Sequence, residues 1–261
     1  MSRGFGVAAG LDPEVATPLA ARCDALGYSS MWSNDHPGGS GLETLAAFAE
    51  GTETLELGVA VMPLDRHEPA AINAKIEELG LNRDRLWLGL GAGFSKRPLT
   101  TMREALPELR RELPGVRLVL AAMGPKMSTL AGAGYDAAFL NWMTPDSVTT
   151  ARGFVADGSS TADRQAPPVF GYVRAAIGPD AAERLGKEEA FYRELHDGYR
   201  RHFARIGEPE GTVGVAAADA GAAAKGLAAF NQLDVTVVRG LASANLDAMA
   251  AVAGAAAPPA R

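Results

Sequence analysis

The sequence predicts a single α/β domain over residues 1–252, folded as a (β/α)₈ TIM barrel. Short β-rich runs alternate with helical patterns from end to end, eight such strands can be counted in 261 residues, and no linker divides the chain. This length and pattern match the barrel. The second interpretation, an open doubly wound sheet, usually has fewer strands and a glycine-rich first turn, which GLDPEV does not offer.

In the first half, the expected strands are short apolar runs that end at turn residues. They are Phe5–Ala9, Ser29–Ser33, Leu55–Met62 (LELGVAVM) and Arg85–Leu90 (RLWLGL). The helices between them begin near proline or end at glycine, where helices are started and stopped most readily. They are expected from Asp12-Pro13 to Gly27, over Leu42–Glu50 and over Pro69–Leu79.

The second half repeats this pattern. Its expected strands are Val116–Ala121, Asp136–Leu140, Val169–Ala176 and Val235–Arg239, and 211–215 reads as irregular. Its expected helices are Thr101–Leu113, one from the AAMGPKM turn to about Gly132, one capped by Thr144, Ala220–Gln232 and Ser243–Val252.

A helical extension at about 179–206 is longer than a minimal crossover requires. Phe191, Leu195, Tyr199, Phe203 and Ile206 recur there at three- and four-residue spacing, which indicates core packing or a dimer surface. Residues 253–261 are rich in alanine and proline, and we expect a flexible tail.

Charge and composition exclude several classes of function. Lys and Arg total 25 against 31 Asp and Glu, a formal net charge of -6, and no basic stripe is present that could follow a nucleic acid backbone. Cys23 is the only cysteine, so an intramolecular disulfide is impossible. The first apolar run is too short for a signal peptide or a membrane span. We therefore expect a cytoplasmic protein without nucleic acid or membrane partners.

The stretch YSSMWSNDHPGG places Asn34, Asp35 and His36 at the end of the second strand. In (β/α)₈ barrels the reactive groups lie at the carboxyl ends of strands. A histidine beside a carboxylate can take or give a proton near neutral pH. The alternative interpretation is that Asp35 and His36 bond the backbone of the turn. No second His or carboxylate cluster follows at a suitable spacing, so the sequence predicts no metal site.

Other candidates for the same rim follow later strands. Gly91 and Gly93, in GLGAG, indicate either a turn with positive φ or backbone close beneath a flat ligand. The AAMGPKM turn starts a helix whose free N–H groups, with Lys126, could hold a phosphate, although an ordinary helix start is the alternative. Trp142 could pack against a ring system or simply against the protein.

Four segments in order resemble the bacterial luciferase-like monooxygenase family, and within it the branch that uses the deazaflavin cofactor F420. They are GYSSMWSNDHP, LELGVAVMPLDRHEPAAINAKIEELGLNRDRLWLGLGAGF, VLAAMGPKMSTLAGAGYDAAFLNWMTPD and GYVRAAIGPDAAERLGKEEAFYRELHDGYRRHFARIG. The resemblance implies a luciferase-like barrel, a homodimer, and reduced flavin or deazaflavin across the carboxyl face.

The resemblance also implies roles for residues. Asp35 and His36 match the acid/base position, and the family's non-proline cis peptide falls near Ala60-Val61. The cofactor-binding positions that it implies, together with the rim candidates, are Asp35, Gly58, Ala60, Val61, Gly91, Gly93, Ala121, Ala122, Met123, Gly124, Pro125, Lys126, Asn141 and Trp142.

The chain departs from the family pattern in one clear way. A long insertion usually precedes the fifth strand, whereas here only 113–115 connect the helix to that strand. We therefore expect an F420-dependent oxidoreductase that transfers hydride to or from a small organic substrate and has less structure over that substrate. An FMN-dependent monooxygenase is the alternative. A non-catalytic flavin-binding protein, or an unrelated barrel enzyme acting on a phosphorylated metabolite, would be of another class.

Overall fold

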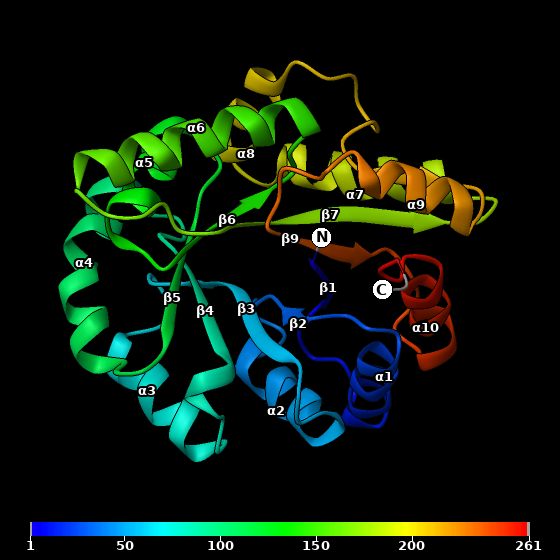
Figure 1. Ribbon diagram of the computed structural model, residues 1–261, viewed down its shortest axis with the longest axis horizontal. Coiled ribbons are helices and arrows are strands. Elements are labelled where there is room, and N and C mark those ends of the chain that lie inside the picture. The colour runs from blue at the N-terminus through cyan, green and yellow to red at the C-terminus, as the bar shows by residue number, and fades with distance from the viewer. Residues whose placement is uncertain (1, 260–261) are drawn as a thin grey trace.

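The computed structural model describes residues 2–259 and shows a closed barrel of eight parallel strands (Figure 1). The barrel strands are β1 (Ser2–Val7), β2 (Ser30–Ser33), β3 (Glu56–Pro63), β4 (Leu86–Gly91), β5 (Arg117–Ala121), β6 (Ala137–Asn141), β7 (Val169–Ile177) and β9 (Val235–Gly240). Each pairs with its neighbour in chain order, and β6–β7, β7–β9 and β1–β9 pairings complete the ring. The predicted fold class is confirmed.

One further strand, β8 (Val215–Ala217), pairs only with the end of β7. The sequence predicted irregular structure at 211–215, because a run of three residues is too short to show strand periodicity.

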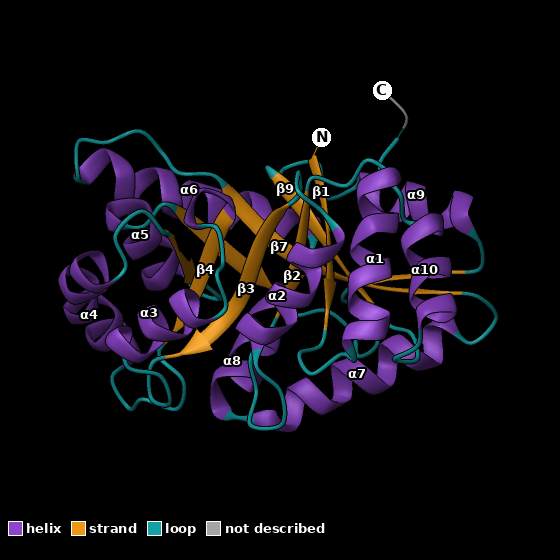
Figure 2. Ribbon diagram, turned by 90° about the horizontal axis from the view of Figure 1, so that it is seen from below, coloured by secondary structure: helices purple, strands orange, loops and turns teal. Residues whose placement is uncertain are grey.

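Helices surround the barrel in both views (Figures 1 and 2). They are α1 (Pro13–Ala25), α2 (Gly41–Gly51), α3 (Pro69–Glu78), α4 (Pro98–Glu112), α5 (Pro125–Gly134), α6 (Pro145–Thr161), α7 (Ala181–Leu195), α8 (Asp197–Ile206), α9 (Ala220–Ala228) and α10 (Leu246–Ala255), with a 3₁₀ turn at Arg83–Arg85. Local sequence starts many of them. Asp12, Ser40, Asp219 and Asn245 each accept a hydrogen bond from a first-turn N–H group, and Thr144 forms a capping box with Ser147.

Side chains alternate between two cores along each barrel strand. On β7, Phe170 and Tyr172 lie inside the barrel with Trp32, whereas Val169 and Val173 pack against the helices. The alternation continues to the carboxyl end, so that the next inward positions are Arg174 on β7 and Arg239 on β9.

The segment 179–206 contains two helices, α7 and α8. Phe203 is buried, while Phe191 and Leu195 are exposed, so one side of the extension is core.

The homodimer remains a prediction. Among residues 2–259, no helix is long and apolar enough to cross a membrane.

The expected tail begins later than the sequence predicted. Helix α10 runs to Ala255, and Arg3 donates hydrogen bonds to the carbonyls of Ala256 and Ala257. The alanines there continue the buried face of α10, which composition alone did not show. The end of the expected tail, residues 260–261, lies outside the described residues.

Helices α5 and α6 pack through glycines, which gives a test of the packing. A Cβ atom at Gly158 would lie 2.0 Å from the carbonyl oxygen of Thr129, whereas Gly153, on the same helix, has nothing within 4 Å. We expect Gly158→Ala to lower the free energy of unfolding by about 1–3 kcal/mol because the helices must separate. Gly153→Ala should raise it by about 0.5–1 kcal/mol through helix propensity. Urea unfolding of both variants checks this, and equal effects would contradict it.

Candidate functional site

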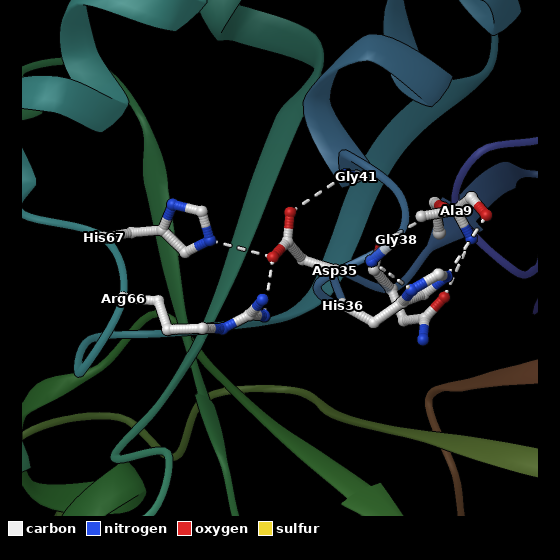
Figure 3. Close-up of polar contacts among 9 residues, drawn as sticks. Ala9, Asp35, His36, Gly38, Gly41, Arg66 and His67 are labelled. Atoms are coloured by element: carbon white, nitrogen blue, oxygen red, sulfur yellow. Dashed lines mark hydrogen bonds and ion pairs between the residues drawn. The ribbon is translucent and has the colours of Figure 1, made fainter.

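His36 lies in the loop after β2, and both of its ring nitrogens are engaged (Figure 3). The Gly38 N–H donates to Nδ1 at 3.1 Å, and Nε2 lies 3.3 Å from the carbonyl oxygen of Ala9. Because Nδ1 accepts, the proton of the neutral ring is on Nε2 and points at that carbonyl. Asn34 supports the same loop by accepting from the Ala9 N–H at 2.9 Å.

Asp35 points away from His36, toward the loop after β3 (Figure 3). Its Oδ1 atom accepts from Arg66 Nη2 and His67 Nε2, each at 2.8 Å, and its Oδ2 accepts from the Gly41 N–H at the start of α2. The carboxylate is almost fully buried, with 4% of the side chain exposed.

Asp35 and His36 therefore do not contact each other, and each accepts a hydrogen bond from nearby backbone, as the alternative interpretation predicted. Consecutive side chains of an extended segment point in opposite directions, and this separates the two. The histidine paired with Asp35 is His67, which the sequence analysis missed. The sequence did offer one signal for His67, because it lies in the loop after a barrel strand, where site residues are expected.

A cavity of about 350 Å³ lies at the carboxyl ends of β2 and β3, and both histidines line it. Asp35, Arg66 and Lys75 also line it, so it combines two imidazoles, one buried carboxylate and two cations. Such a set can hold an anionic or polar ligand group and exchange a proton with it.

Next to this cavity, β3 bulges. The Ala60-Val61 peptide bond is cis, at the position that the resemblance predicted, and the pairing register with β4 shifts between Val59 and Met62. A Cβ atom at Gly91 would lie 3.1 Å from Val61 Cγ2 and 3.8 Å from Ala121 Cβ. The small residues Ala60, Gly91 and Ala121, from the adjacent strands β3, β4 and β5, therefore meet at the barrel mouth.

Gly58, also predicted to bind cofactor, lies deeper. A Cβ atom there would be 2.2 Å from the ring of Trp32, which fills the barrel interior. Its lack of a side chain makes room for that tryptophan, away from the mouth.

Gly93 has φ of +56°, which confirms the turn interpretation. The Asp65 carboxylate occupies the space that a side chain would take, and it accepts from the Phe94 N–H at 2.8 Å. This contact joins the loops after β3 and β4. The exposed Phe94 ring then reaches His196 at the α7–α8 corner, with ring centroids 5.8 Å apart.

The turn from Ala122 to Lys126 leads into α5, with Gly124 before Pro125 at the first helical position. The carbonyl oxygen of Met123 accepts a hydrogen bond from Arg205 of α8, and the Arg205 guanidinium lies about 3.6 Å from a Cβ position at Gly124. Lys126, the second residue of α5, is exposed. Arg205 was not predicted, because it lies 82 residues after Met123 in the chain.

Trp142 is buried, with 1% of its surface exposed, and has φ of +54°. The Arg174 guanidinium stacks over its ring at 4.2 Å, and the rings of Tyr192 and Phe203 cover it. This placement leaves no ring face open for a cofactor and agrees with the packing interpretation. Asn141 bridges Arg174, from which it accepts, and the Tyr199 hydroxyl, to which it donates at 3.0 Å.

His202 of α8 is buried between the loops after β5 and β6. Its Nε2 lies 2.7 Å from the carbonyl oxygen of Trp142, and its Nδ1 lies 2.8 Å from Arg205 Nη2 and 2.9 Å from the carbonyl oxygen of Met123. Arg205 can only donate, so in the neutral ring Nδ1 accepts from Arg205 and Nε2–H donates to Trp142, whereas a protonated ring would donate to both carbonyls. Burial lowers the pKa of His202 below its ordinary value. In its neutral form the residue donates to the loop after β6, and Arg205 links it to the loop after β5.

Comparison with known proteins identifies the family that the chain resembles. Residues 3–114 match the family described as luciferase-like monooxygenase. The resemblance to this family is confirmed. The 5,10-methylenetetrahydromethanopterin reductase of Methanolobus tindarius is 26% identical over 201 residues, which cover 63% of this chain and 62% of that protein. The match thus spans less than two thirds of that relative's length.

Solved structures share the luciferase-like barrel. An F420-dependent secondary alcohol dehydrogenase in complex with an F420-acetone adduct superposes with a TM-score of 0.76 at 16% identity, covering 99% of this chain and 98% of that one. The oxygenating constituent of 3,6-diketocamphane monooxygenase from Pseudomonas putida, in complex with FMN, gives 0.68 at 14% identity and covers 100% of both chains. At these identities the likeness shows the fold.

The lowered pKa of His202 predicts how the stability of the barrel depends on pH. The unfolded chain binds a proton at about pH 6.5, and the folded chain only at lower pH, so the free energy of unfolding should fall as pH drops below about 6.5. His202→Gln should flatten this dependence.

Thermal unfolding of wild type and variant between pH 5 and pH 8 measures the effect. Burial also lowers the pKa of His196, but this ring is more exposed, so His196→Asn serves as the matched control and should change the slope less. An unchanged slope in His202→Gln would contradict the assignment of a neutral His202.

Proposed function

We propose that this luciferase-like chain is an F420-dependent oxidoreductase that transfers hydride between the deazaflavin and a small organic substrate. The observation that carries the proposal is the barrel mouth over β3–β5, where Gly91 and Ala121 adjoin the Ala60-Val61 bulge and lead to the basic start of α5. A flat ring with a phosphate-bearing tail matches that combination of small residues and positive charge. The likeness to an F420-dependent secondary alcohol dehydrogenase supports it.

The residues present fit this cofactor. The Ala60-Val61 bulge, Gly91 and Ala121 would support its ring, since these adjacent positions carry no large side chain. The start of α5 at Gly124, with Lys126 and Arg205, would hold its phosphate. When bound, F420 supplies or accepts the hydride.

In this proposal His36 moves the proton that accompanies the hydride. Its Nε2–H contact to the Ala9 carbonyl is long, at 3.3 Å, so exchanging it for a substrate oxygen costs little. Asp35 acts as a positioning residue, because it joins Arg66, His67 and the start of α2 on the other side of the loop.

An FMN-dependent monooxygenase is the second candidate. The likeness to the FMN complex of the 3,6-diketocamphane enzyme favours it, since the same helix start would hold the FMN phosphate.

Titration of the purified chain with F420 and FMN in parallel, followed by fluorescence, tests the cofactor. Preference for F420 would support the first proposal, preference for FMN the second, and binding of neither would contradict both. We expect Arg205→Ala and Lys126→Ala to weaken binding about tenfold or more, since each removes a charged contact to phosphate. Arg201→Ala, an exposed arginine of the same helix, is the matched control and should bind as wild type does.

Steady-state turnover tests the proton carrier, with a substrate found by screening small alcohols and ketones. His36→Ala should reduce kcat about 10²-fold or more while cofactor affinity stays within about twofold. His67→Ala is the comparison, because this ring lines the same cavity but is held by Asp35. Loss of kcat in His67→Ala alone would assign the proton to His67 instead.

A further inference from the structure

Two arginines lie side by side at the barrel mouth without a carboxylate partner. Arg174 on β7 and Arg239 on β9 are register partners on adjacent strands, and both occupy inward positions. Among residues 2–259, neither forms an ion pair with an acidic side chain. Glu188 interacts with Arg239 electrostatically but forms no ion pair with it.

Most of their hydrogen-bond donors are also unused. Arg174 Nη1 donates to Asn141 Oδ1, and its buried Nε has no partner within the described residues. Arg239 Nη1 makes one long contact, 3.5 Å, to the Gly6 carbonyl oxygen. A guanidinium carries five N–H donors arranged as a planar fork, so the pair has several donors that no described residue accepts from at short distance.

Arg174 is buried and Arg239 is half-buried, and placing two like charges together in this way is unfavourable unless a counter-charge joins them. Only 3% of the surface of Arg174 is exposed. Its guanidinium carbon lies 4.2 Å from the centroid of the Trp142 ring and 4.9 Å from that of the Tyr192 ring. Burial lowers the pKa of Arg239 below its ordinary value and Arg174 lowers it further, while Tyr172, Tyr192 and Glu188 act in the opposite direction.

The pair faces the other half of the mouth. In the ring of eight strands, β7 lies opposite β3 and β9 lies opposite β4. The arginines therefore lie across the barrel mouth from the Ala60-Val61 bulge and Gly91. A ligand bound above the proposed cofactor ring would reach this side of the mouth. Asn141, half exposed between the two halves, already orients Arg174.

We propose that Arg174 and Arg239 bind an oxyanion of the substrate, a carboxylate or a phosphate, on the β7–β9 side of the barrel mouth. This inference rests on the proposed function for its assignment to the substrate. Guanidinium forks bind both oxyanions in a bidentate manner, so the chemistry is shared and the probes must separate the two sources.

The test uses the full chain without cofactor and titrates it with inorganic phosphate and, separately, acetate at constant ionic strength. Tryptophan fluorescence reports binding because Trp142 stacks on Arg174, and the melting temperature reports it independently. We expect saturable changes with at least one anion, and the tighter of the two identifies the oxyanion class. Arg239→Gln and Arg174→Gln should weaken binding at least tenfold, while Arg22→Gln, an exposed arginine of α1, should not.

Arg174→Lys guards against a failure to fold, since it keeps the charge but loses the fork and should bind more weakly than wild type. Anion binding that is absent, or equal in wild type and Arg239→Gln, would overturn the proposal. So would a tenfold loss of F420 or FMN affinity in Arg239→Gln, because the pair would then belong to the cofactor. If wild type binds neither cofactor, the proposed function fails, whereas the anion titration still decides whether the arginines form an oxyanion site.

Discussion

Closure of the parallel sheet is the constraint on which the whole site depends. Because β1 pairs with β9 and β6 pairs with β7, all eight barrel strands end at one rim, and loops far apart in the chain become neighbours. The same closure fixes which side chain of each strand points inward. Residues that are ordinary in their own segments thereby form one mouth.

The barrel interior is layered. Trp32, Trp87, Phe139, Phe170 and Tyr172 fill it with aromatic rings, several in edge-to-face contact. At the next inward positions toward the carboxyl ends, β4 and β5 carry the small residues Gly91 and Ala121, whereas β7 and β9 carry two arginines. The aromatic layer closes the barrel below, so a ligand can enter only the upper layer.

Helix α8 connects this mouth to the shell of helices. His202 and Arg205 bond the loops after β5 and β6, while Tyr199 accepts from Asn141 at the end of β6. A protein without a long insertion before β5 thus covers part of its mouth with the extension after β7. Stability and site geometry are coupled through α8, since the contacts that hold the helix also set the loops.

Local patterns in the sequence determined the fold class and most of the elements. Strand runs such as LELGVAVM and caps such as Thr144 act through neighbours in the chain, so they were readable without the fold. The rim position of His36 and the cis bond at Ala60-Val61 also followed from the sequence and its resemblance. The contacts of Asp35 with His67, of Met123 with Arg205 and of Arg174 with Arg239 did not. Those partners lie 32, 82 and 65 residues apart, and only the register and closure of the barrel bring them together.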